Sequence, residues 1–210
     1  KLAAKPQSSL IVTKRLMKQH LAAQVQTVMA EEGELFGRML REPAAREAYA
    51  RALRMDPEFT AGRTAYAGYL AARGDRAAAE NTLRSGLERQ PGDADLHFRL
   101  GLLLAEDGRL PEAVRELQAA AKRAPDNARI AYNLGLALMQ ADRPRDALGA
   151  LNKAVRLDAQ EPAYAYALAL LLYRQGQAGE ARAHAERAVA LNPGDPAALQ
   201  LLTAIRRGQR

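Results

Sequence analysis

The sequence predicts an all-α protein built from a repeated pair of helices, and three observations lead to this fold class. Ala, Leu and Arg, which favour helices, are abundant in a chain of 210 residues of which only 5% are aromatic. Similar residues recur at a step of 34, such as Gly101 and Gly135, or Pro91 and Pro125. Glycine and proline interrupt each step, so each unit is expected to hold two helices joined by a turn.

The repeated positions explain why glycine stands inside a helix. In the first helix of a unit, Gly101 and Gly135 share a position with Ala169. Glycine there costs roughly 1 kcal/mol relative to alanine, which close packing of two helices offsets. The same step gives alanines in the second helix at Ala113, Ala147 and Ala181, turn glycines at Gly74, Gly108 and Gly176, and prolines at Pro57, Pro91, Pro125 and Pro193.

These positions together resemble the tetratricopeptide repeat family, whose units are about 34 residues long. The resemblance implies a right-handed superhelix of antiparallel helix pairs, an α-solenoid, with a capping helix at its C-terminal end. It predicts a domain over residues 60–210, with repeats at about 60–93, 94–127, 128–161 and 162–195 and a capping helix at 196–207.

Helix ends are predicted from the same positions. Pro125 should stop a second helix, and Asp126 or Asn127 should cap the helix that follows. Asp195 should cap the last helix, with Pro196 as its first residue. In that helix we expect Leu199, Leu202 and Ile205 to face the stack, and Gln200, Arg206 and Arg207 to face water.

The third repeat departs from the pattern at two positions. Asp142 stands where other units have the turn glycine, and Ala159 stands where they have proline. We therefore expect the second helix of this unit to run slightly longer than the others.

Residues 1–59 are predicted to form an N-terminal helical region, and two interpretations of it stay open. Residues 26–59 fit the repeat as a degenerate unit that lacks the turn glycine. Alternatively, residues 3–53 resemble the C-terminal helices of the enoyl-CoA hydratase/isomerase (crotonase) family, at Lys5-Pro6, Thr13-Lys14, the acidic run up to Phe36, and Glu47-Ala48. That resemblance implies helices that serve oligomer assembly and help to cover an acyl-CoA pocket.

Composition and motifs narrow the function classes. The net charge is +7, but basic residues alternate with acidic ones, which indicates a solvated helix surface and no nucleic-acid partner. No apolar run reaches the roughly 18 residues of a membrane span. We expect a cytoplasmic protein, with the periplasm as the alternative because the chain opens at Lys1 without Met.

No catalytic, cofactor or metal site is predicted. The chain has no cysteine, and His20, His97 and His184 lie on separate predicted helices with no second ligand nearby. Phosphate-binding glycine loops and nucleophile-elbow contexts are absent from the sequence. We therefore expect a protein that is not an enzyme.

The resemblance implies that first helices line the concave face of the superhelix, and the repeat step then selects the residues there. Aromatic residues recur in one position and leucines four residues later, although the leucines could equally belong to the core of the stack. The predicted partner-binding residues are Phe98, Arg99, Leu102, Arg129, Tyr132, Asn133, Leu136, Met139, Tyr166, Leu170, Tyr173 and Arg174.

These residues predict a scaffold that binds a peptide or an amphipathic helix of a partner protein in the groove. Arg99, Arg129 and Asn133 resemble the clamp with which some family members hold the terminal carboxylate of a peptide, but the full clamp set is absent. The alternative function is an oligomerisation or docking region of a larger acyl-CoA-type, crotonase-like enzyme. A homo-oligomer formed through the N-terminal helices is a further expectation.

Overall fold

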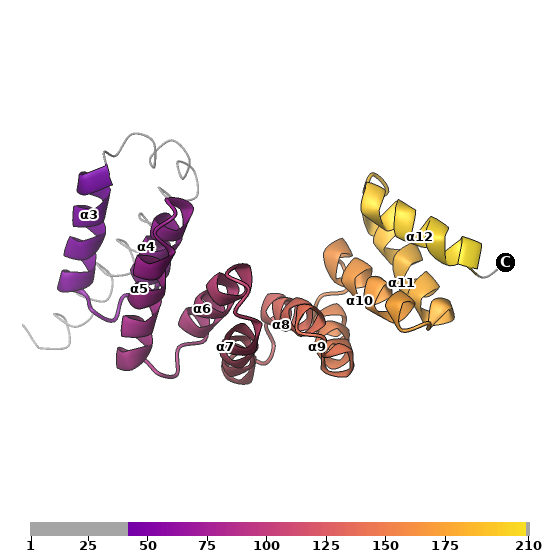
Figure 1. Cartoon of the computed structure of the whole chain (residues 1–210), viewed down its shortest axis with the longest axis horizontal. Helices are drawn as coiled ribbons and strands as arrows, with labels where there is room; N and C mark the ends of the chain where they lie inside the picture. Colours follow the sequence, from indigo (N-terminus) through magenta and orange to yellow (C-terminus); the bar gives the residue numbers. More distant parts are fainter. Residues whose placement is uncertain (1–41, 209–210) are drawn as a thin grey trace, which may run out of the picture.

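The computed structural model describes residues 42–208, and this part of the chain consists of α-helices and connecting turns without strands (Figure 1). The helices are α3 (Glu42–Met55), α4 (Thr60–Ala72), α5 (Arg76–Arg89), α6 (Ala94–Glu106), α7 (Leu110–Arg123), α8 (Ala128–Gln140), α9 (Pro144–Leu157), α10 (Pro162–Arg174), α11 (Ala178–Leu191) and α12 (Pro196–Gly208). None of these helices is long and apolar enough to cross a membrane.

The helices pack as consecutive pairs: α4 with α5, α6 with α7, α8 with α9, and α10 with α11. Pairs follow one another along the long axis of the molecule, and α12 packs on α11 at the C-terminal end (Figure 1). Every first helix has 13 residues and every second helix has 14. The predicted all-α stack of helix pairs is confirmed.

Helix α3 takes the place of a second helix in this arrangement. It has 14 residues, begins one repeat length before α5, and packs on α4. Of the segment that resembles the crotonase family, only residues 42–53 belong to the described part of the chain, where they form most of α3. The rest of that segment, together with Gly33, lies outside the described residues.

Glycine permits the close approach of paired helices, as predicted. A Cβ atom added to Gly101 would lie 2.7 Å from Cγ of Leu117, and one added to Gly135 would lie 2.6 Å from Cδ2 of Leu151. Both leucines are completely buried. The leucine side chains therefore occupy the space that a larger residue in the first helix would need.

The turn within each unit requires a left-handed backbone. Gly74, Gly108 and Gly176 have φ angles of 83°, 73° and 77°, and Asp142 adopts the same region with a φ of 54°. Aspartate is one of the few residues with a side chain that visits this region routinely. The departure at Asp142 therefore leaves the turn geometry unchanged.

The expectation of a longer second helix in the third unit is wrong. Helix α9 ends at Leu157 and has 14 residues like the other second helices. Asp158 adopts an extended conformation, and its carboxylate accepts a hydrogen bond from the backbone N–H of Gln160 (3.0 Å). An Asx-type turn therefore stops the helix in the absence of proline.

Predicted helix caps are present at the starts of α8 and α12. Asn127 accepts a hydrogen bond from the backbone N–H of Ile130 (3.1 Å), and Asp195 accepts one from the N–H of Ala197 (2.9 Å). The predicted packing of α12 needs one correction. Ile205 is completely buried, but Leu199 is 42% exposed, because Leu201 and Ala198 occupy the face that meets the stack.

Candidate functional site

Helix α10 leaves one narrow side uncovered. Past its first residue, the residues that are not buried are Ala163, Tyr166, Leu170, Tyr173 and Arg174. Ala163, Tyr166, Leu170 and Tyr173 follow one another at intervals of three or four positions, which places them on a single face. The rest of the helix packs into the core. Its accessible face therefore presents aromatic and aliphatic side chains.

Helix α8 carries the matching face one unit earlier. Tyr132, Leu136 and Met139 are half-buried there and stand one repeat length before Tyr166, Leu170 and Tyr173. Helices α8 and α10 contact each other directly, so the two faces lie side by side. We call these six residues the α8–α10 surface. All six were predicted from the sequence to bind a partner.

The predicted residues on α6 are placed differently. Phe98 is only 2% exposed and belongs to the hydrophobic core. The guanidinium of Arg129 lies over its ring, 5.1 Å from the ring centroid. Leu102 is half-buried and packs against the same core. Phe98 thus lies beneath the guanidinium of Arg129 and does not belong to the accessible surface.

Tyr164 belongs to this region although the sequence did not predict it. Its ring lies 4.8 Å from that of Tyr132, and it is 9% exposed. Burial raises the pKa of Tyr132 and Tyr164, and the nearby carboxylate of Glu161 raises it further. Both hydroxyls therefore stay protonated at neutral pH and are able to donate a hydrogen bond.

Polar residues predicted for the site differ in their availability. Arg99 pairs with Asp95 at 3.5 Å, and the Asn133 side-chain amide donates to the backbone carbonyl of Arg129 (2.8 Å). Arg129 and Arg174 are exposed and make no ion pair with a described residue. Of the three residues that resemble a carboxylate clamp, Arg129 is the one whose side-chain N–H groups form no hydrogen bond or ion pair with a described residue.

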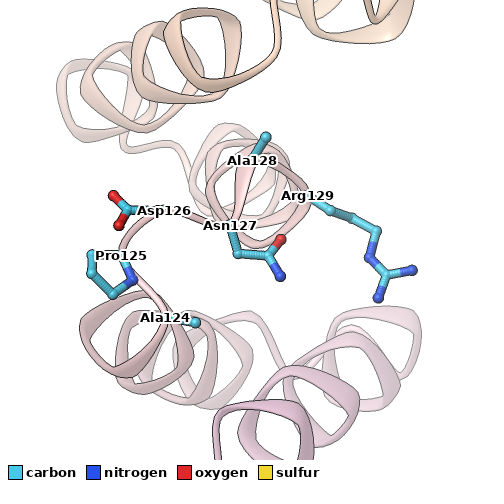
Figure 2. A pocket seen from close by; sticks show the side chains of 6 residues that line it. All are labelled: Ala124, Pro125, Asp126, Asn127, Ala128 and Arg129. Atoms are coloured by element: carbon cyan, nitrogen blue, oxygen red, sulfur yellow. The ribbon is translucent and has the colours of Figure 1, made fainter.

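An open hollow lies at the loop before α8, lined by residues 124–129 (Figure 2). Asn127 and Arg129 project to one side of this loop, and Asp126 lies on the other (Figure 2). Arg129 lines this hollow together with Asn127, the cap of α8, and lies at the edge of the α8–α10 surface.

Among residues 42–208, no cluster of three or more histidine, aspartate or glutamate side chains is arranged to hold a metal ion. Both ring nitrogens of His97 already have partners, since they lie 2.7 Å from Oε2 of Glu116 and 3.0 Å from the carbonyl oxygen of Pro91. His97 is therefore part of the contact between α6 and α7.

Comparison with known protein families agrees with this geometry. The tetratricopeptide repeat family matches residues 67–128, 108–162 and 132–196, which together cover more than half of the chain. The chain belongs to the tetratricopeptide repeat family. A comparison with curated proteins finds no match.

Solved structures of other tetratricopeptide repeat proteins share the fold. PilF of Pseudomonas aeruginosa aligns with a TM-score of 0.78 and 22% identity over 93% of this chain and 86% of its own. YrrB, a TPR protein with an unusual peptide-binding site, aligns with a TM-score of 0.68 and 20% identity over 77% and 84%. The first TPR of Spaghetti (RPAP3), bound to the HSP90 peptide SRMEEVD, aligns with a TM-score of 0.54 and 20% identity over 55% of this chain and 92% of its own.

At these identities the neighbours establish a common fold. Membership of the tetratricopeptide repeat family supports a protein-interaction scaffold as the broad function of this chain. The kind of ligand that the α8–α10 surface binds depends on the residue types of that surface.

Proposed function

We propose that this chain is a protein-interaction scaffold that binds a peptide or a helix of a partner protein on the α8–α10 surface, in the concave groove of its solenoid. The observation that carries this proposal is the continuous, half-exposed row of tyrosine, leucine and methionine across two neighbouring first helices. Stacked helix pairs offer such faces as extended binding surfaces.

The residue types of this surface suit peptide recognition. Tyrosine combines a large apolar ring with a hydroxyl that pairs with the polar backbone of a ligand, and methionine adapts its shape to different side chains. Tyr166 and Tyr173 lie seven residues apart on α10, about two helical turns. The accessible row is therefore long enough to contact several side chains of one peptide.

The proposed groove is tested with peptides selected on the full chain from a random peptide library. Tyr166→Ala should weaken the binding of selected peptides about tenfold, because a half-exposed aromatic anchor is lost. We choose Tyr166 because Tyr132 also supports the buried ring of Tyr164. Isothermal titration calorimetry measures the affinity, and thermal unfolding checks that the variant is folded.

Leu157→Ala is the control, since Leu157 is a large hydrophobic residue that is 38% exposed and belongs to a second helix, α9. It should leave the affinity unchanged. If Tyr166→Ala binds the peptides as tightly as the unmodified chain, or if both variants weaken binding equally, the groove proposal is wrong.

A further inference from the structure

Acidic residues are absent from three consecutive first helices. Neither α8, nor α10, nor α12 contains an aspartate or a glutamate, although each contains arginine. The second helices between and beside them do carry acidic residues in their first turns, such as Asp146 in α9 and Glu180 in α11. The helices that form the α8–α10 surface therefore contribute no carboxylate of their own, and Glu161, the residue before α10, is a carboxylate that lies near Tyr132.

The arginines of these helices flank that surface in the sequence. Arg129 lies one turn before Tyr132, and Arg174 directly follows Tyr173. Arg207 on α12 stands one repeat length after Tyr173, in the equivalent position of the next helix. All three are exposed, and none forms an ion pair with a described residue, whereas Arg206 is bound to Glu186 (3.1 Å).

Arg129 is held in place without neutralisation of its charge. Its guanidinium lies 5.1 Å from the centroid of the buried Phe98 ring, a cation–π contact that fixes the group. Stacking occupies a face of the guanidinium, so the N–H groups along its edge are still able to donate hydrogen bonds. Because Arg129 is already restrained, its side chain loses less conformational entropy when it binds a carboxylate than a freely moving arginine would lose.

Three carboxylates in the loops before α10 and α12 accept hydrogen bonds from backbone N–H groups. Glu161 accepts a hydrogen bond from the backbone N–H of Ala163 (3.3 Å), and Asp195 accepts one from Ala197 (2.9 Å). Asp158 is bound to the N–H of Gln160 (3.0 Å). Glu161 and Asp195 stabilise the positive ends of α10 and α12. None of the three carboxylates forms an ion pair with Arg129, Arg174 or Arg207, so these arginines are available to an external anion.

We propose that the partner segment is an acidic amphipathic peptide. Its apolar side chains lie on the α8–α10 surface, and its carboxylates bind Arg129 at one end and Arg174 and Arg207 at the other. This inference rests on the proposed function and adds the charge of the ligand to it. Charge complementarity selects against basic segments of similar hydrophobicity.

The test compares peptides selected from a random library on the full chain. Selected peptides should be enriched in aspartate and glutamate together with apolar residues. A double variant, Arg129→Gln with Arg174→Gln, should bind them about ten- to a hundredfold more weakly, since hydrogen bonds to charged groups are lost. Raising the salt concentration from about 0.1 M to about 1 M should reduce the affinity of the unmodified chain more than that of the variant.

The control double variant, Arg145→Gln with Arg156→Gln, removes the same charge from exposed positions of α9. It should bind the peptides as the unmodified chain does. Equal weakening by both double variants, or selected peptides that are neutral or basic, would overturn the acidic partner. If such peptides still lose affinity with Tyr166→Ala, the proposed groove stands without it; if they do not, both proposals fail.

Discussion

Single side chains decide how closely the two helices of a unit approach each other. Gly135 leaves room for the buried side chain of Leu151, and Gly101 does the same for Leu117. The backbone N of Leu151 lies only 3.4 Å from the position of an added Cβ on Gly135. The backbone of α9 therefore also contacts this position, and α9 cannot move away from α8 without disturbing the packing of the core.

Gly135→Ala should destabilise the chain by about 1–3 kcal/mol, because the added methyl group overpacks the contact with Leu151. Gly149→Ala is its control: Gly149 lies inside α9 with nothing within 4 Å of an added Cβ. That change should stabilise the chain by up to about 1 kcal/mol through helix propensity. Urea denaturation measures both, and two changes of the same sign would contradict the packing argument.

The sequence predicts why these glycines are present, but not which side chain fills the space beside them. Alanines such as Ala147 in the second helix were expected to provide the close contact, and they are indeed buried. The atoms nearest to Gly135 belong to Leu151, one turn further along. Which turn meets which depends on the crossing angle of the helices, which the spacing of small residues leaves undetermined.

Helices α5 and α7 are joined by an ion-pair network between consecutive second helices. Glu80 on α5 binds Arg84 (2.6 Å) on its own helix and Arg109 (2.6 Å) beside α7, and Arg109 also binds Glu112 (2.7 Å). The hydrogen bond from Arg109 is the main cause of the lowered pKa of Glu80, and Arg84 lowers it further. The charged form of Glu80 is therefore favoured by folding.

Acidification should remove this contribution in a defined direction. Since the pKa of Glu80 is lower in the folded chain than its usual 4.5, the stabilisation is complete above pH 4.5 and declines as the pH falls through the folded value. Glu80→Gln should therefore be less stable than the unmodified chain near neutral pH, with a weaker loss of stability toward about pH 3. Urea melts across this range measure the slope, and an unchanged slope would contradict the role of Glu80.

Helix boundaries show where prediction from a sequence succeeds and where it does not. The caps Asn127 and Asp195 follow directly from residue type and position. The end of α9 was misjudged because the missing proline was taken as the signal, while Asp158 stops the helix by bonding to the backbone of Gln160. The same type of bond occurs after α3, where Asp56 accepts from the backbone N–H of Glu58 (3.3 Å) beside Pro57. The aspartate and the proline are therefore separate signals for the same helix end.

The molecule as a whole is stabilised by contacts between neighbouring units, as in other solenoids. Helix α12 packs on α10 and α11 and buries Ala198, Leu201, Leu202 and Ile205. Without it, the core around Ala188 would face water. The stability of the α10–α11 pair therefore depends on α12.

Ile205→Ala should destabilise the chain by about 2–5 kcal/mol, because a completely buried side chain is truncated. Leu199→Ala, on the same helix but 42% exposed, should change stability by no more than about 0.5 kcal/mol. Hydrogen exchange should show that Ile205→Ala increases exchange in α10 and α11 more than in α4 and α5. A uniform increase would mean that the whole stack unfolds as one unit.

The stack could be predicted from the sequence, and the candidate site only in part. Repeat positions led to Tyr132 and Tyr166, which lie on the accessible face, and equally to Phe98, which is buried. Equivalent positions differ in burial because each depends on the side chains of neighbouring units, here on Arg129. The position of a residue within the repeat thus predicts which way its side chain points. The neighbouring side chains determine how far it is exposed to solvent.

The constant spacing of helix starts makes the unit interchangeable along the chain. The first helices and α12 begin at equal intervals, at Thr60, Ala94, Ala128, Pro162 and Pro196, so duplication of one unit would keep every later helix in phase. A copy of residues 128–161 inserted directly after the original would extend the α8–α10 surface by one further tyrosine, leucine and methionine. Duplication of a unit in the gene can therefore lengthen the stack of helix pairs without changing how the existing units pack.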